Sequence, residues 1–333
     1  MSLASMPIHE SGCSLADWVE FKTLVAEYKL YRLSGLTRIM DEEQGEENED
    51  FTEQDAINER LLEAVAEELA VRAKYLSSAY PFYFNDDQTE LHCCKEWTVG
   101  QYIYLYCLIF SHVNREEVLL VSPPAGNADR DIMQICATYA AAGIVHGNAV
   151  SFGFPRPDHS NFLDALKKTY ASVGEGEVHD QIPAGAPRDE KDARIDVIAW
   201  DNSLDGAPGR YYLLGQVATG KNWKNKSIMG EISLFHNTWF KQSPPSTPNP
   251  AMFIPFCIEK EENATLSQAM SYLTEKFGKV YYRYRLPKYA EDGFLLASND
   301  EKKEYQVDRI GEVSKIKNYV ESFLAILNQP YSD

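Results

Sequence analysis

Residues that serve phosphate chemistry gather around one expected hairpin. Asp196 lies inside an otherwise apolar strand, 195–200, and Gln216 lies at the end of the next expected strand, 211–217. Hairpin partners lie side by side, so an aspartate on the first strand and a carboxylate or amide on the second can share one divalent metal ion. Three lysines follow the second strand at once: Lys221, Lys224 and Lys226. A lysine at such a point can orient a water or stabilise charge on a phosphate.

The segments that carry these residues resemble the PD-(D/E)XK nuclease superfamily, which has the restriction-endonuclease-like fold. They are 191–200 (KDARIDVIAW) and 215–223 (GQVATGKNW). The chain is also similar to a group of bacterial proteins thought to act in restriction or phage defence. The residue patterns of two segments carry this similarity, 150–157 (VSFGFPRP) and 251–256 (AMFIPF). The resemblance covers roughly residues 129–258.

The resemblance implies a role for each matching residue. Asp196 matches the metal-binding aspartate, and Gln216 matches the second position, where some members of the superfamily use glutamine. Ala218 stands where the lysine of the pattern is expected, so Lys221 or Lys226 has to substitute for it from the loop or from the next helix.

The same resemblance implies a metal-dependent reaction. The expected cofactor is Mg²⁺ or Mn²⁺, which activates water for in-line attack on a phosphodiester. Glutamine is a neutral ligand, so the metal calls for a second carboxylate, and Asp192 or Asp131 on the preceding helix is available. The implied activity is that of a Mg²⁺-dependent endodeoxyribonuclease in antiviral defence. A catalytically inactive nuclease-fold subunit that binds nucleic acid or a partner protein is the alternative, because the lysine is displaced.

Charge is distributed unevenly along the chain. The net charge is −18, and residues 41–68 alone carry −12, whereas 207–242 carry +4 and 276–290 carry +5. Non-specific nucleic-acid binding needs clustered lysine and arginine. The two basic segments supply such clusters despite the overall acidity.

The second basic segment interleaves bases with tyrosines. If 280–286 is a strand, Tyr281, Arg283 and Arg285 share one face, which suits contacts with phosphates and sugars. The expected nucleic-acid contacts are Lys224, Lys279, Arg283 and Arg285. The alternative is a strand whose polar face lies in water.

Structural roles compete with the functional ones at each position. Asp196 can pair with Arg194 or Arg210, and Gln216 can be a hydrogen-bonding residue at the edge of the core. Lys221 can be a solvated turn residue. The sequence contains neither the GxGxxG motif of dinucleotide-binding enzymes nor the GxSxG motif of serine hydrolases, which argues against both classes.

Periodicity and turn signals predict a mixed α/β chain. Helices are expected over 15–34, 51–75, 97–112, 131–142, 162–170, 226–240, 266–277 and 313–327. Strands are expected over 150–154, 195–200, 211–217, 251–258 and 280–286.

These elements suggest two domains, separated at the run Pro123–Asn127. We expect a mainly helical N-terminal domain, 1–125, and a restriction-endonuclease-like α/β domain, 126–333. In the second domain a mixed sheet is flanked by helices, with a core at 129–258 and a C-terminal extension at 259–333.

The sequence predicts a cytoplasmic protein. The longest apolar run has nine residues, Tyr102–Phe110, which is too short to span a membrane, and no secretory signal is evident. Six cysteines without a CxxC pair are typical of reduced, mostly buried residues. Expected partners are DNA and a partner protein subunit or a second copy of the chain, because the net acidity weakens binding to free DNA.

Overall fold

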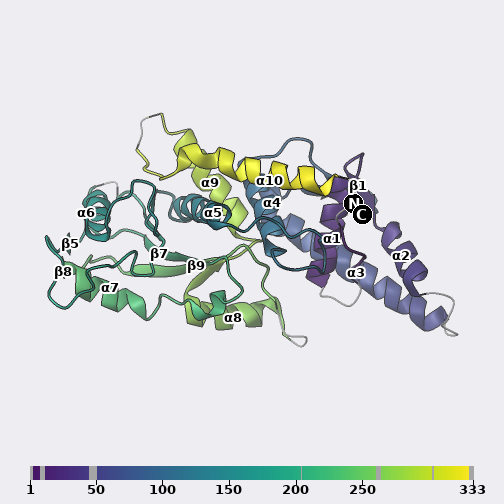
Figure 1. The fold of residues 1–333 in the computed structure, drawn as a ribbon, viewed down its shortest axis with the longest axis horizontal. Coiled ribbons are helices and arrows are strands. Elements are labelled where there is room, and N and C mark those ends of the chain that lie inside the picture. The colour runs from purple at the N-terminus through teal and green to yellow at the C-terminus, as the bar shows by residue number, and fades with distance from the viewer. Residues whose placement is uncertain are drawn as a thin grey trace. The chain divides into compact units, whose positions relative to one another are not determined.

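The chain is described from a computed structural model that covers residues 3–7, 12–44, 51–203, 205–259, 264–301 and 304–329. It divides into two compact units, one formed by Met1–Gly126 with Lys315–Asp333 and the other by Asn127–Ser314 (Figure 1). The second unit starts next to the boundary run expected from the sequence. The C-terminal helix, in contrast, groups with the N-terminal unit.

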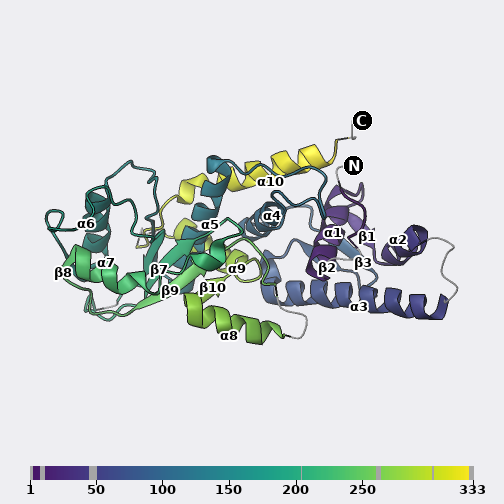
Figure 2. The ribbon, with the colours of Figure 1, turned by 60° about the horizontal axis from the view of Figure 1, so that its bottom comes forward.

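The first unit combines helices with a small antiparallel sheet. Its helices are α1 (Gly12–Val25), α2 (Ser34–Gln44), α3 (Phe51–Leu76), α4 (Val99–Ser111) and most of α10 (Val313–Leu327). Its strands are β1 (Leu30–Arg32), β2 (Phe82–Phe84) and β3 (Glu90–Cys93), with β3 in the middle. Figure 2 shows the long helix α3 alongside α1 and this sheet.

The helix expected over 15–34 is confirmed up to Val25 and wrong beyond it, and the sheet of the first unit explains why. The helix ends at Val25, and Lys29 takes a left-handed conformation (φ 55°) before β1 begins. β1 then pairs with β3, for example Leu30 with His92. This pairing joins residues about 60 positions apart, so local periodicity carries no trace of it.

Aromatic contacts hold α10 to the first unit. The Tyr319 hydroxyl donates a hydrogen bond to the Pro124 carbonyl (2.9 Å), and its ring lies 5.1 Å from that of Tyr106 on α4. The Tyr102 hydroxyl donates to Glu321 (2.6 Å). These contacts account for the grouping of the C-terminal helix with the N-terminal unit.

A buried ionic network lies at the centre of the first unit. The Arg72 guanidinium is fully buried and contacts Asp17 (2.7 Å), Glu20 (2.9 Å) and Glu68 (3.0 Å). The Tyr104 hydroxyl also donates to Glu20 (2.8 Å). Each charge therefore has a partner, which is the condition under which buried ions are tolerated.

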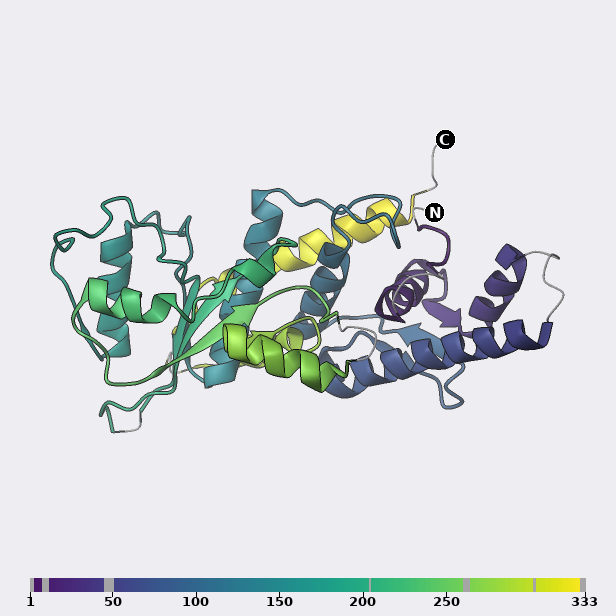
Figure 3. The ribbon, with the colours of Figure 1, turned by 90° about the horizontal axis from the view of Figure 1, so that it is seen from below.

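The second unit is built on a five-stranded mixed sheet. Its strands are β4 (Asn148–Ser151), β6 (Val197–Trp200), β7 (Tyr212–Val217), β9 (Pro248–Phe253) and β10 (Lys279–Tyr281). Their spatial order is β10-β9-β7-β6-β4. β4, β6 and β7 are antiparallel neighbours, whereas β7, β9 and β10 are parallel. The long strands of this sheet lie side by side in Figure 3.

Helices connect and cover these strands. They are α5 (Asn127–Val145), α6 (Phe162–Val173), α7 (Glu231–Trp239), α8 (Leu266–Phe277) and α9 (Leu286–Ser298). α7 lies in the crossover from β7 to β9 and α8 in that from β9 to β10, as parallel neighbours require. A two-stranded ribbon of β5 (Glu177–Val178) and β8 (Phe240–Gln242) completes the unit.

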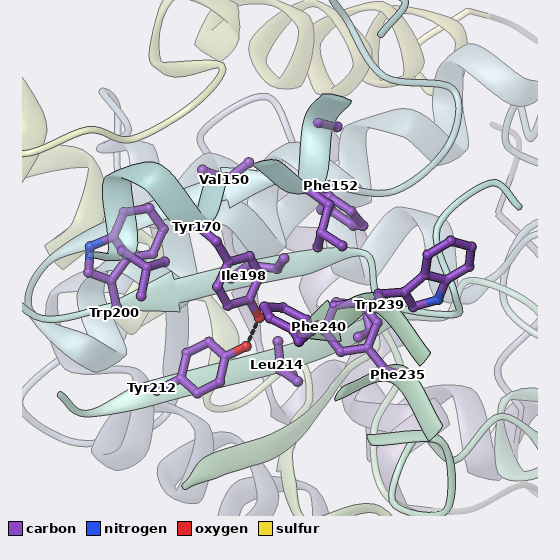
Figure 4. Close-up of a cluster of buried hydrophobic side chains, with 14 of the residues drawn as sticks. Val150, Phe152, Tyr170, Ile198, Trp200, Tyr212, Leu214, Phe235, Trp239 and Phe240 are labelled. Carbon is purple, nitrogen blue, oxygen red and sulfur yellow. Dashed lines mark hydrogen bonds between the residues drawn. The ribbon is translucent and has the colours of Figure 1, made fainter. Parts of the chain in front are cut away.

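One face of the sheet carries the aromatic core of the unit. Ile198, Trp200, Tyr212 and Leu214 pack there against side chains of α6 and α7 (Figure 4). The Tyr170 and Tyr212 hydroxyls are hydrogen-bonded within this core. Successive strand residues point to opposite faces, so the intervening residues face α5, which contacts β4, β6 and β7.

Two glycines bring α5 and α9 into backbone contact. A Cβ atom on Gly143 would lie 2.0 Å from the Tyr289 carbonyl oxygen, and one on Gly293 would lie 2.0 Å from that of Tyr139. The helix expected over 131–142 does not end before Gly143, since α5 continues to Val145. This glycine serves close packing between helices and not helix termination.

The sequence predicted most elements of the second unit and misassigned one segment. The hairpin of β6 and β7 is confirmed, and so is the order helix, strand, helix, hairpin, helix, strand from α5 to β9. The strand expected over 280–286 is wrong beyond Tyr281, because the chain turns there and α9 begins at Leu286, with Pro287 in its first turn. The fold is a mixed α/β architecture, as expected.

Candidate functional site

Asp196 lies at the junction of three strands. It directly precedes β6, and its amide donates to the Gly215 carbonyl on β7 (2.8 Å). Its own carbonyl accepts from the amides of Phe152 (2.8 Å) and Gly153 (2.9 Å), which follow β4. The backbone of Asp196 is thus held from both sides, and this fixes where the carboxylate points.

The carboxylate of Asp196 accepts a backbone hydrogen bond at the end of the hairpin, where the Val217 amide would otherwise need a carbonyl acceptor. Its Oδ2 accepts from the Val217 amide (2.7 Å). Its Oδ1 lies beside Gly153, where an added Cβ atom would approach to 2.6 Å. Glycine at position 153 therefore leaves the space that this oxygen occupies.

Burial raises the pKa of the Asp196 carboxyl to about 7. The hydrogen bond from Val217 opposes this rise, the negative charge of Asp192 adds to it, and the positive charge of Lys226 opposes it. A carboxylic acid with a pKa near neutrality can exchange a proton at physiological pH, and a bound cation would favour its ionised form. Such a perturbed group in a pocket marks a candidate functional site.

A pocket of about 530 Å³ opens beside Asp196. Its lining includes Arg130, Asp131 and Gln134 of α5, Phe154 of the loop after β4, and Thr219 after β7. The Asp131 carboxylate pairs with the Arg309 guanidinium (2.7 Å), and Gln134 donates to the Asp196 carbonyl. The volume lies within the range of ordinary small-ligand sites.

Asp192 organises the loop next to the pocket. Its Oδ1 accepts from the Arg194 amide (2.9 Å) and its Oδ2 from the Phe154 amide (3.3 Å). Its charge acts on Asp196, as the pKa shows, so the two carboxylates are neighbours. As a metal ligand, Asp192 would have to share its oxygens with these two amides.

Gln216 is buried in β7, with 9% of its surface exposed. Its Oε1 has no hydrogen-bond partner among the residues that the structure describes. The residue after it, Val217, is the one that binds the Asp196 carboxylate. A buried oxygen without a partner is costly, so it points to a ligand or water at this position.

The three candidate lysines differ in their surroundings. Lys226 is half-buried at the end of a short 3₁₀ helix, Trp223–Asn225, and its charge acts on Asp196. Lys221 is exposed in the turn after β7, and Lys224 is exposed beside the Trp223 ring (5.9 Å). Of these three lysines, Lys226 is the one whose charge acts on the Asp196 carboxyl group.

The basic residues expected to contact nucleic acid are not on one face. Lys279 donates to the Tyr211 hydroxyl (2.6 Å), and Arg285 is exposed over the Tyr282 ring (5.5 Å). Arg283 is fully buried (0% exposed) and contacts Cys257. A side chain without exposed surface cannot reach a phosphate, so the contact expected of Arg283 is wrong for this conformation.

Of the residues that line the pocket, only Asp131 and Asp196 were expected in the site from the sequence, and Arg130, Gln134 and Phe154 were not. Gln134 is a polar residue in the apolar run of α5, which is a weak signal by itself. Phe154 belongs to segment 150–157, which carries part of the resemblance, but nothing in that segment marks it as a site residue. Their relevance depends on being brought beside Asp196 by α5 and by the loop after β4.

Comparisons with protein-family models, with curated proteins and with solved structures give no match for this chain. No helix in the described ranges is long and apolar enough to cross a membrane.

Proposed function

We propose that the second unit is a metal-dependent nuclease that cleaves DNA phosphodiester bonds with Mg²⁺ or Mn²⁺. The observation that carries the proposal is the Asp196 carboxyl, which lies at the end of a hairpin, lines a pocket and has a pKa raised to about 7. The charge of Lys226 acts on it from the segment after β7.

The donor atoms suit a hard divalent cation. Such ions prefer oxygen ligands, and Asp196 supplies a carboxylate while Gln216 supplies a buried amide oxygen that no residue in the described ranges binds. Asp192, whose charge acts on Asp196, is an additional carboxylate, and Asp131 lines the same pocket as Asp196. When bound, the ion would lower the pKa of a water and neutralise charge on the phosphate.

The chain's own residues would then act on the phosphodiester. Water adds to phosphorus, the bond to the leaving oxygen breaks, and negative charge grows on the phosphate oxygens. The Lys226 ammonium is positioned to stabilise that charge, since it lies within electrostatic range of Asp196. Arg130 at the rim of the pocket can hold the DNA backbone.

The fold supports the same proposal. The order helix, strand, helix, hairpin, helix, strand from α5 to β9 agrees with the order expected from the sequence, with Asp196 directly before β6 and Gln216 on β7. This order supports the proposal together with the resemblance of segments 191–200 and 215–223. We accordingly propose a role in bacterial antiviral defence, in the cytoplasm. None of the six cysteines, all of which lie in the described ranges, forms a disulfide, which suits a reducing compartment.

A partner is part of the proposal. The net charge of −18 opposes binding to free DNA, so we propose a partner subunit or a second copy of the chain that completes the DNA-binding surface. Dissociation constants for duplex DNA weaker than about 1 μM at physiological salt would support this idea. Tighter binding by the isolated chain would contradict it.

An inactive nuclease-fold subunit is the second candidate. Three observations favour it: Ala218 occupies the expected lysine position, Gln216 is a neutral ligand, and Arg283 is buried. Such a subunit would bind nucleic acid or a protein without cleaving.

A cleavage assay separates the two candidates. Supercoiled plasmid, linear duplex and single-stranded DNA are incubated with the full chain and Mg²⁺, Mn²⁺ or EDTA. The nuclease proposal expects metal-dependent cutting that Asp196→Asn lowers by at least about 100-fold. Asp205→Asn, in the exposed hairpin turn, makes the same change in charge and should cut normally.

The lysine assignment has its own comparison. Lys226→Met should lose cleavage, whereas Lys221→Met should keep it, because only the former charge acts on Asp196. Absence of cutting on every substrate, with both metals and at high enzyme concentration, would favour the inactive subunit.

A further inference from the structure

Phe154 is an aromatic side chain displayed at the pocket of Asp196. Its ring lines the pocket, and 53% of its surface is exposed. Most other phenylalanines of the second unit, such as Phe152, are buried. An exposed aromatic ring beside a polar pocket is a candidate surface for a flat, unsaturated ligand.

The backbone around Phe154 is held in place. The Gly153 amide donates to the Asp196 carbonyl (2.9 Å), and the Phe154 amide donates to Asp192 (3.3 Å). Arg156, only 4% exposed, donates through both terminal nitrogens to the Lys191 carbonyl (2.7 Å each). The ring is therefore presented by an ordered loop, and a ligand does not have to order it on binding.

Cationic groups flank the exposed ring. The Lys191 ammonium lies 5.1 Å from the centroid of the Phe154 ring. Arg130 lines the same pocket from α5 and donates to the Thr219 hydroxyl (3.2 Å). An exposed ring with one cation over it and another in the same pocket suits a nucleotide, whose base stacks on the ring while its phosphate meets the positive charges.

We propose that this pocket binds an unpaired nucleotide of a DNA strand, with its base stacked on Phe154 and its phosphate near Lys191 and Arg130. The assignment to DNA rests on the function proposed above. In an intact duplex both faces of each base are covered by its neighbours, so only an unpaired, terminal or flipped base can offer a face to the ring. The preferred substrate is accordingly single-stranded DNA or a duplex with a single-stranded end.

Stacking of a base on Phe154 can be measured by fluorescence in EDTA, where metal-dependent cleavage cannot occur. Single-stranded oligonucleotides that carry one 2-aminopurine are titrated with the full chain in EDTA at low ionic strength, and the same sequences are titrated as duplexes. We expect quenching of the fluorescence with the single strand and much less with the duplex. Phe154→Ala should weaken single-strand binding roughly 5- to 150-fold, the range for loss of one base–aromatic stack.

Control variants separate stacking from general surface effects. Phe154→Tyr keeps a ring and should bind as the wild type does. Tyr272→Ala removes a similarly exposed aromatic side chain from α8 and should leave binding unchanged. Phe154 is exposed, so its substitution should leave the melting temperature near that of the wild type, which excludes a folding defect as the cause.

Each outcome bears on one proposal. Quenching that depends on Phe154, without cleavage under any metal condition, would support the inference and overturn the nuclease proposal. Metal-dependent cutting of blunt duplex that Phe154→Ala does not change would support the nuclease and overturn the inference. Loss of self-association in Phe154→Ala with unchanged DNA binding would show that a second copy covers the ring, and would also overturn the inference.

Discussion

The strongest physical prediction concerns the charge of Asp196. The substitution Asp196→Asn removes the ionisable group and keeps its size, and the asparagine oxygen can still accept from the Val217 amide. In the folded chain the pKa of the carboxyl lies at about 7, against 3.8 for an unperturbed aspartate. Ionising this group in the folded state therefore opposes folding.

The sign and size of the effect follow from proton linkage. Between pH 3.8 and about 7 the folded chain binds more protons than the unfolded chain, so the free energy of unfolding falls as the pH rises. The loss is about 1.4 kcal/mol per pH unit and levels off above pH 7 at about 4 kcal/mol. Asparagine escapes this loss, so the variant should be increasingly more stable than the wild type as the pH rises.

Urea unfolding in EDTA at several pH values between about 5 and 8 measures this difference. We expect the advantage of Asp196→Asn to grow by about 3 kcal/mol across that range. Asp205→Asn should show no such trend, because its side chain is exposed. A difference between variant and wild type that stays constant with pH would refute the reasoning. It would mean that the carboxylate is solvated or paired more fully than the structure indicates.

A bound divalent cation should offset the loss of folding stability that ionisation of Asp196 causes. Mg²⁺ or Mn²⁺ bound to the ionised carboxylate stabilises the folded chain by mass action, so the wild type should gain stability at pH 8. Asp196→Asn should gain none at the same concentration. An equal gain in both proteins would place the cation elsewhere.

Further predictions concern glycine packing and a buried histidine. Gly153→Ala should displace the Asp196 carboxylate and abolish cleavage. Gly230→Ala should leave cleavage unchanged in the same assay, because a Cβ atom added at Gly230 has no neighbour within 4 Å among the described residues. His236 is buried, and burial lowers its pKa to about 4, so the unfolded chain binds a proton there first as the pH falls. The stability of the wild type relative to His236→Phe should therefore fall by about 2 kcal/mol from pH 7 to pH 5, as measured by urea unfolding of both proteins. Gly143→Ala should force α5 and α9 apart and lower the melting temperature by several degrees; an unchanged melting curve would contradict the backbone contact.

Elements with local signals were predictable from the sequence. The helix expected at 266–277 has those bounds in the structure, because Thr265 and Gln268 form a capping box and Gly278 ends the helix. The Asp196 position was also identifiable, since a carboxylate in an apolar strand breaks the pattern around it. These features depend on residues within a few positions of one another.

Features that depend on distant contacts were not predictable. The alternation of tyrosine and arginine at 280–286 is typical of a strand, yet the chain turns after Tyr281. Pro287 lies in the first turn of α9, a position that proline favours at the start of a helix. The burial of Arg283 against Cys257 depends on packing that no local pattern encodes. The same holds for Phe154 and Gln134, which become neighbours of Asp196 only through the fold.

The glycine crossing of α5 and α9 has a consequence for how this sequence can vary. The atoms that exclude a side chain at Gly143 and Gly293 are carbonyl oxygens and amide nitrogens of the opposing helix. A clash with backbone atoms cannot be relieved by a smaller side chain elsewhere. A second substitution therefore cannot compensate for a side chain introduced at Gly143 or at Gly293. In a selection from randomised codons at both sites, functional clones should therefore retain glycine at each. The helix that carries Gln134 and Asp131 to the pocket then keeps its position, however freely the surrounding surface changes.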